Sequence, residues 1–175
     1  MTARAPLFRR ILGAQFDLLP IPLKRVHASC ISAQFSGRCD IARGRSRTAR
    51  VLGYVAGLPS AGNDVPVTVD ILCKPHGETW IRRFGRHRMQ SSLAERDGRL
   101  VERLGPVQLT FSLEVVADSI VWTAVDARVF GVRLPLSWFS KVSATEAVEG
   151  GCYTFDVRAE LPRVGLLIHY RGWLE

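Results

Sequence analysis

A chain of 175 residues, 47 % hydrophobic and 23 % charged, can bury a core without disulfides or metal ions, and this composition excludes a disordered chain. The net charge is +8, and the excess lies in residues 1–50, which hold 10 Lys and Arg against 2 Asp and Glu. Charged residues and prolines interrupt the apolar stretch near the N-terminus. It therefore predicts neither a signal peptide nor a transmembrane segment, and we expect a cytoplasmic protein.

Short helices are expected ahead of the first strand. Residues 6–14 begin with a proline, which is favourable at the first position of a helix, and their apolar residues share one face. A second short helix is expected over residues 22–27, after a proline-containing turn. Alternation over residues 31–35 then predicts a strand, which we expect to break at residues 36–37 and to resume over residues 39–41.

One amphipathic helix is expected from Ser46 to Val55. Ser46 can cap its N-terminus, and Val51, Leu52 and Val55 form an apolar stripe. A stripe of this kind normally faces a core, so we predict that the helix packs on the sheet or closes one end of it. The alternative is a helix that lies on anionic lipid through its arginines. We favour it less, because the apolar face is short for that purpose.

The most strongly basic segment surrounds the start of this helix and contains Arg43, Arg45, Arg47 and Arg50. Basic clusters attract nucleic acid, anionic lipid or acidic proteins. The simplest interpretation is a solvated basic surface, and the alternative is a docking surface for an acidic partner protein. Nucleic acid is disfavoured, because the sequence has no zinc-finger spacing, no recognition-helix motif and no aromatic-basic signature of an RNA-binding sheet.

Period-two alternation of apolar residues dominates the rest of the chain and indicates half-buried strands. The segments expected to be strands are 65–73, 79–84, 87–95, 99–104, 107–116, 119–130, 142–149, 152–161 and 165–174. The gaps are too short for crossover helices, so the sheet must be antiparallel, and Asp97-Gly98 and Gly150-Gly151 suit two-residue hairpin turns. Residues 134–139 are expected to form a buried irregular link or one helical turn.

These elements predict a mainly β fold, α+β by content. It is a single antiparallel meander of about 8–10 strands, curled into a barrel, a half-barrel or a two-layer sheet. Short N-terminal helices and one helix near 46–56 accompany the sheet. We expect one domain over residues 1–175, with a helical and basic segment and the first strand in 1–62 and the antiparallel sheet in 63–175.

The densest run of chemically active side chains is residues 80–88. On a strand, Trp80 and Arg82 share one face, Arg83 lies on the other, and His87 follows the turn. If one face lines a cavity, an arginine there can bind a carboxylate or phosphate through two hydrogen bonds. The alternative is an outward-facing strand whose arginines pair with acidic residues of the neighbouring hairpin.

The last strand carries a second candidate surface. Its expected core face leaves His169, Arg171 and Trp173 together on the opposite face. That face is too aromatic and too basic for an ordinary surface. We therefore expect it to line a pocket or to contact another chain.

Asp126 stands out in the strand expected over 119–130, because it follows Trp122 on an otherwise apolar face. A carboxylate on such a face must be paired or must lie near an opening. We predict Arg171 or Arg83 as its partner, and we include Trp122 and Asp126 among the candidate ligand-binding residues.

The chain lacks the common catalytic motifs, with no GxGxxG after a strand, no GxxxxGK, no HExxH and no GxSxG. Its histidines are isolated and its four cysteines have no metal-binding spacing, so we predict no metal site, no cofactor and buried reduced thiols. The balance is against an enzyme. A catalytic cavity built on Asp126 and His169 is one remaining alternative.

Four segments carry a resemblance that covers nearly the whole chain: LFRRILG at 7–13, WIRRFG at 80–85, RLVERLGP at 99–106 and LPRVGLLIHYRGWL at 161–174. Together they resemble a bacterial family of uncharacterised domains, number 4166 among the domains of unknown function. Residues 86–89 depart from the family pattern, in which a glycine and an aromatic residue are expected. The resemblance implies an accessory role beside nucleotide-dependent reductase domains, and it implies no catalytic residue.

Two main functions follow. The first is a non-catalytic binding domain, whose curled sheet holds an amphipathic or anionic small molecule in a pocket of several hundred cubic ångströms. The second is a protein-interaction module that docks onto a reductase or an acidic partner through its basic N-terminal third.

Overall fold

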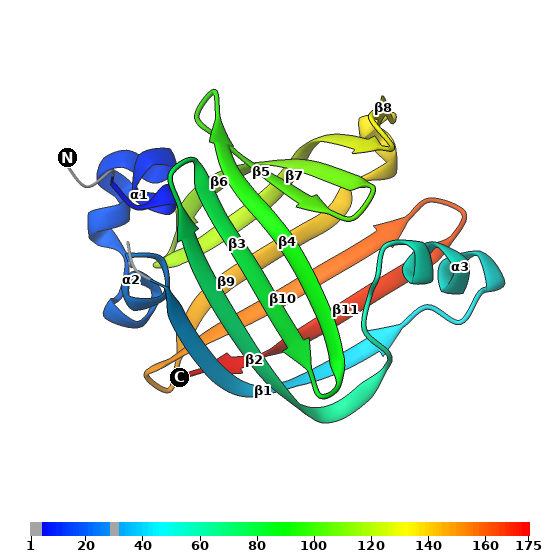
Figure 1. Ribbon diagram of the computed structural model, residues 1–175, viewed down its shortest axis with the longest axis horizontal. Helices are drawn as coiled ribbons and strands as arrows, with labels where there is room; N and C mark the ends of the chain where they lie inside the picture. The colour runs from blue at the N-terminus through cyan, green and yellow to red at the C-terminus, as the bar shows by residue number, and fades with distance from the viewer. Residues whose placement is uncertain (1–4, 29–31) are drawn as a thin grey trace.

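Within residues 5–28 and 32–175, which the computed structural model describes, ten antiparallel strands close into a barrel (Figure 1). The strands are β1 (Ala33–Arg43), β2 (Gly62–Lys74), β3 (Gly77–Phe84), β4 (His87–Arg96), β5 (Arg99–Leu104), β6 (Val107–Val116), β7 (Ser119–Val129), β9 (Lys141–Glu149), β10 (Cys152–Leu161) and β11 (Gly165–Leu174). A short β8 (Val132–Arg133) pairs with the end of β7. The predicted mainly β antiparallel meander is confirmed, and of the three shapes it is the barrel.

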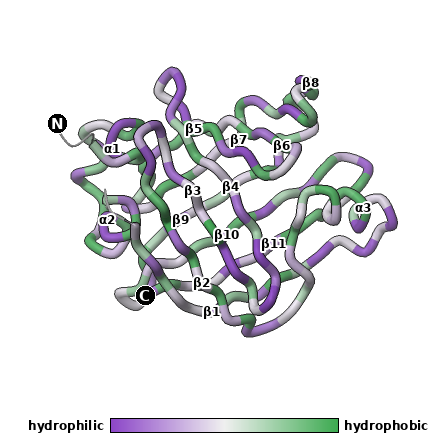
Figure 2. The backbone as a smooth tube through the Cα atoms, viewed as in Figure 1, coloured by the Kyte–Doolittle hydropathy of each residue, from purple (hydrophilic) through white to green (hydrophobic). Residues whose placement is uncertain are grey.

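Neighbouring barrel strands follow one another along the chain, and β11 closes the barrel by pairing with β1. Hydrophobic and hydrophilic residues alternate along these strands (Figure 2), so one side of each strand faces the interior. The hairpin turns at Gly98, Gly150 and Gly151 adopt the positive φ angles that the sequence led us to expect. Local sequence therefore determined both the strands and their turns.

The predicted break in the first strand is wrong, because β1 runs without interruption through Gly37. A Cβ atom at Gly37 would lie 1.8 Å from the carbonyl oxygen of Trp173 on β11. The glycine thus marks a close approach of two backbones inside a continuous ladder. Ile31, where alternation was expected to begin, lies outside the described residues.

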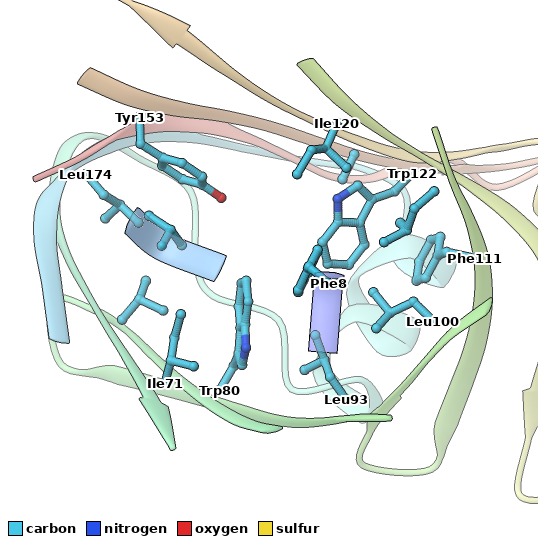
Figure 3. Packing of buried hydrophobic residues seen from close by; sticks show 14 of the residues in the cluster. Phe8, Ile71, Trp80, Leu93, Leu100, Phe111, Ile120, Trp122, Tyr153 and Leu174 are labelled. Carbon is cyan, nitrogen blue, oxygen red and sulfur yellow. The ribbon is translucent and has the colours of Figure 1, made fainter. Parts of the chain in front are cut away.

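Three short helices close one end of the barrel: α1 (Leu7–Leu12), the 3-10 helix η1 (Gly13–Leu18) and α2 (Ile21–His27). Phe8, Leu23 and His27 are fully buried or nearly so, and the helices contact β4, β6, β9 and β10. Figure 3 shows Phe8 among the side chains that fill the barrel, and its ring centroid lies 5.6 Å from that of Trp122. The N-terminal segment therefore forms a plug, which we call the helical plug.

Helix α3 (Arg47–Val55) lies at the opposite end of the barrel and packs on β11 (Figure 1). Ser46 caps it through a hydrogen bond from the Ala49 amide, as predicted. The predicted orientation is wrong, however. The residues that α3 buries are Ala49 and Gly53, and the apolar stripe with Val51 faces outward.

The segment between β7 and β9 contains the expected single helical turn, the 3-10 helix η2 (Leu136–Trp138). Phe139 is buried, but Leu136 and Trp138 remain half exposed, so a fully buried link was the wrong expectation. Strand β8, which precedes this turn, lies at the same end of the barrel as α3 (Figure 1).

We expect Phe8→Ala to destabilise the protein by about 3–5 kcal/mol, because it would leave a cavity where the helical plug meets the core. Urea unfolding monitored by circular dichroism measures the change. The control is Ile21→Ala in the same plug, whose side chain is 80 % exposed and whose loss should change stability by less than about 0.5 kcal/mol. Equal stabilities of the two variants would mean that the plug is not anchored through Phe8.

A candidate polar site inside the barrel

Strand β3 brings ionisable side chains into the barrel. Its alternation turns Glu78, Trp80 and Arg82 inward, and all three are buried. Burying charged groups costs free energy unless partners compensate it. The partners of these three residues therefore define the chemistry of the interior.

The Arg82 guanidinium is held by two oxygens and one ring. Its Nη1 donates hydrogen bonds to Ser91 Oγ at 2.9 Å and to Glu102 Oε1 at 3.1 Å, and its Cζ lies 4.8 Å from the centroid of the Trp80 ring. Burial opposes the charge, but Glu102, Tyr170 and Tyr153 together outweigh this effect and raise the pKa of Arg82. Arg82 is thus a fixed cation inside the barrel.

His27 links the helical plug to the barrel wall. Its Nε2 lies 2.6 Å from Oε2 of Glu146 on β9, and its ring lies 3.7 Å, between centroids, from that of Phe8. Among the described residues, Nδ1 of His27 is buried without a hydrogen-bond partner. This hydrogen bond ties the plug to the strand that carries Glu146.

A second buried carboxylate lies near this pair. Glu78 accepts a hydrogen bond of 2.7 Å from Nε1 of Trp80. Burial raises the pKa of Glu78, an effect that the hydrogen bond from Trp80 and the nearby His27 reduce. The interior therefore holds one carboxyl group with an increased tendency to remain protonated.

Two phenols face the same interior. Burial raises the pKa of Tyr170 to about 12 and raises that of Tyr153 well above its ordinary value, where the carboxylate of Glu146 adds to the effect. Both hydroxyl groups are therefore protonated at neutral pH and can donate hydrogen bonds. Figure 3 shows Tyr153 pointing into the barrel.

Of these polar groups, Arg82, Glu146 and the two tyrosines line a cavity of about 40 Å³. Its lining residues are Val67, Val69, Trp80, Arg82, Phe84, Glu146, Tyr153, Phe155, Val157, Tyr170 and Leu174. Such a volume holds about three water molecules, so the expected pocket of several hundred cubic ångströms is wrong. Large side chains from the plug and the strands occupy the interior instead.

Of the residues proposed from the sequence as ligand-binding, three lie inside the barrel: Trp80, Arg82 and Trp122. Nε1 of Trp122 is buried and has no hydrogen-bond partner within the described part of the chain. Trp80 and Arg82 line the cavity. Trp122 does not, and it packs between Phe8 and Phe111.

The other predicted binding residues lie outside the interior. Arg83 pairs with Asp70, His87 Nε2 lies 2.9 Å from the Gly57 carbonyl oxygen, and His169 Nε2 lies 2.9 Å from Oδ1 of Asp156. Arg171 and Trp173 border an open groove of about 430 Å³ on the outer surface, near Asp40 and Thr154. The outer face of β11 is therefore not part of the interior site.

The predicted pairing of Asp126 with Arg83 or Arg171 is wrong. Asp126 pairs instead with Arg133 and Arg128 on the outer surface. A register shift in the β6–β7 ladder places Asp126 opposite Thr110 and Ala124 opposite Phe111, so the alternation changes face between them. Ala127, rather than Asp126, is consequently buried.

Asp126 and His169 do not form a joint catalytic site. Asp126 lies on β7 and His169 on β11, with β9 and β10 between these strands, and each has its own side-chain partner. The alternative of an enzyme built on this pair therefore has no geometric basis.

The basic patch divides into two parts. Arg43 is half-buried and donates a hydrogen bond of 3.0 Å to the Pro59 carbonyl oxygen, and burial lowers its pKa. Arg45, Arg47 and Arg50 are exposed. Arg43 thus belongs to the attachment of α3, and only the other three arginines form a surface patch.

Sequence reasoning missed His27, Glu78, Glu146, Tyr153 and Tyr170 as members of the interior cluster. One signal was available, because Glu146 follows Val142 and Ala144 on one face of its strand. A carboxylate on an apolar face requires a partner, which was the argument applied to Asp126. The same argument, applied to Glu146 on β9 in place of Asp126 on β7, would have identified a buried, paired carboxylate.

The structure also bears on metals, thiols and membrane spans. Among residues 5–28 and 32–175, no three His, Cys, Asp or Glu side chains gather to hold a metal ion, and no helix is both long and apolar enough to cross a bilayer. Cys39 is buried, and burial raises the pKa of its thiol to about 11, whereas Cys73 and Cys152 are only half-buried, so among the described cysteines the predicted burial holds for Cys39 alone. Cys30 lies outside the described residues.

Comparison with known families matches residues 19–174 to the model described as Domain of unknown function (DUF4166). The chain belongs to this family. No curated protein matches the chain. Among solved structures, the DUF4166 chain is similar to "Crystal Structure of Rv2717c from M. tuberculosis", with 13 % identity, a TM-score of 0.44, and coverage of 90 % of this chain and 98 % of that one.

The raised pKa of Glu78 predicts a pH-dependent stability difference. Above the ordinary carboxyl pKa the unfolded chain loses this proton before the folded protein does, so Glu78 increasingly favours unfolding as the pH rises. Glu78→Gln should therefore be more stable than the wild type at pH 7, and the gap should narrow toward about pH 4. Urea unfolding at several pH values tests this, with the exposed Glu114→Gln as control. If the stability difference between Glu78→Gln and the wild type stays constant with pH, or widens on acidification, the pKa of Glu78 is not raised in the folded protein.

Proposed function

We propose that the barrel is a non-catalytic binding domain for a small amphipathic molecule with a carboxylate or similar anionic head. The head would bind at Arg82, beside the hydroxyl groups of Tyr153 and Tyr170. The observation that supports this most directly is a buried guanidinium on the wall of an interior cavity.

Hydrogen-bonding capacity supports an acceptor as the ligand head. In the part of the chain that the structure describes, both hydrogen bonds from the Arg82 side chain start at Nη1, although a guanidinium has five N–H donors. The protonated phenol of Tyr170 adds an O–H donor, whereas the hydroxyl of Tyr153 already hydrogen-bonds the Glu146 carboxylate. Because Glu146 is engaged by both His27 and Tyr153, the donors of Arg82 and Tyr170 outnumber the acceptors that remain to them in this cavity.

The shape of the cavity supports a head with a short apolar body. Its walls beyond the polar cluster include Val67, Val157 and Phe84, the last residue of β3 at the α3 end. The helical plug closes the other end through Phe8 and Leu23. The cavity holds only about three water molecules, so an apolar tail would have to displace side chains that fill the interior toward the α3 end, which is also the expected route of access.

Titration with straight-chain carboxylates from butanoate to hexadecanoate, followed by calorimetry, tests the proposal. We expect saturable binding, and we expect Arg82→Gln to weaken it by about tenfold or more, since a hydrogen bond to a charged group contributes about 1.5–3 kcal/mol. The matched control is Arg83→Gln, the adjacent arginine on the outer face of the same strand, which should bind like the wild type.

A second variant guards against misfolding, because Arg82→Gln leaves Glu102 buried without its counter-charge. Glu102→Gln keeps the guanidinium and removes the competing carboxylate, so it should strengthen carboxylate binding. If no chain length binds, or if Arg82→Gln and Arg83→Gln have equal effects while Glu102→Gln has none, the proposal is wrong. Native mass spectrometry of freshly purified protein adds an independent search for a bound molecule.

A further inference from the structure

Helix α3 presents an apolar surface to solvent. Tyr54 is 87 % exposed and Val51 is 62 % exposed, and Val55 is also exposed. Tyr54 and Val55 follow Val51 by three and four positions, so the three residues lie together on the side of the helix opposite Ala49 and Gly53. An exposed apolar group of this kind on a short helix requires an explanation.

The packing of α3 fixes this orientation. A Cβ atom at Gly53 would lie 1.7 Å from a guanidinium nitrogen of Arg43, and a Cβ atom at Gly44 would lie 2.9 Å from the Cβ of Ala49. The helix therefore approaches the barrel closely through its small residues, and Arg43 is bound in turn to the Pro59 carbonyl oxygen. Rotating the apolar face inward would place Val51 where only a glycine or an alanine fits.

Three arginines surround the apolar face. Arg45, Arg47 and Arg50 are exposed, and the salt bridges of the described residues include none of them. Unpaired positive charge beside exposed apolar side chains is the composition of helices that lie at the surface of anionic membranes. The charges attract the headgroups, and the apolar side chains enter the boundary between headgroups and acyl chains.

A second apolar group lies at the same end of the barrel. Phe130 is 76 % exposed and Val132 is 65 % exposed. Leu136 and Trp138 are about half exposed. These residues belong to the segment that contains β8 and η2, which projects from the α3 end (Figure 1). Tryptophan and tyrosine are favoured where a protein meets a membrane interface.

We propose that the α3 end of the barrel is a peripheral docking surface for an anionic lipid bilayer. The membrane-facing residues are Val51, Tyr54 and Val55, with Arg47 and Arg50 beside them. Charge complementarity favours this occupant over a neutral membrane, and the mixture of unpaired arginines with exposed apolar side chains favours it over a purely acidic protein. The proposal does not depend on a ligand in the interior cavity.

Co-sedimentation with vesicles tests the proposal on the full chain. We expect binding to phosphatidylcholine vesicles that contain about one-third phosphatidylglycerol, little binding to phosphatidylcholine alone, and loss of binding in about 0.5 M salt. Arg47→Gln/Arg50→Gln should lower the partition coefficient by about tenfold or more, and Val51→Ser/Tyr54→Ser should lower it similarly. All four positions are exposed, so folding should be unaffected.

The matched control is Leu18→Ser/Ile21→Ser, which removes two exposed apolar side chains from the opposite end and should bind like the wild type. The proposal is overturned if the wild type does not bind anionic vesicles at low salt, or if the control loses binding as strongly as the α3 variants. It is also overturned if polyglutamate binds as tightly as vesicles do, which would indicate an acidic protein partner. A dimer that the α3 variants dissociate would mean that a second copy covers this face.

Discussion

The seam between β1 and β11 is the constraint on which the rest of the structure depends. Gly37 and Gly172 lie at this seam, and a Cβ atom at Gly172 would come within 2.1 Å of the Arg38 carbonyl oxygen. Without side chains at these points the two backbones can pair closely, and the sheet closes rather than remaining open. Closure creates an interior, and the interior in turn gives the inward residues of every strand a common environment.

Inside this closed sheet, polar groups hold one another and also hold the plug. Arg82 is balanced by Glu102, and Glu146 is engaged by His27 from α2. Because such groups are costly to bury alone, removing one member affects the partner that remains. The network therefore serves two purposes in our interpretation: it attaches the helical plug to the wall, and it leaves donors on a small cavity for a ligand head.

The two ends of the barrel differ in chemical character. The plug end is closed by fully buried side chains such as Phe8, whereas the α3 end carries exposed apolar residues and unpaired arginines. If both proposals hold, a ligand with an apolar tail would reach the cavity from a membrane surface through the α3 end. The arrangement is consistent with a domain that binds and presents a molecule, and it requires no catalytic group.

The sequence by itself determined the strands, their antiparallel order and most of their turns, because period-two alternation and turn residues are local properties of the chain. It also indicated that Trp80 and Arg82 share a face. Only the tertiary structure decided which face became the interior, since a register shift before Asp126 reverses the alternation and closure brings β3, β9 and β10 together. It likewise decided the orientation of α3, because close contact through Ala49 and Gly53 outweighed the burial of the larger apolar side chains. Such contacts join residues that are far apart in the chain, so local sequence patterns do not predict them.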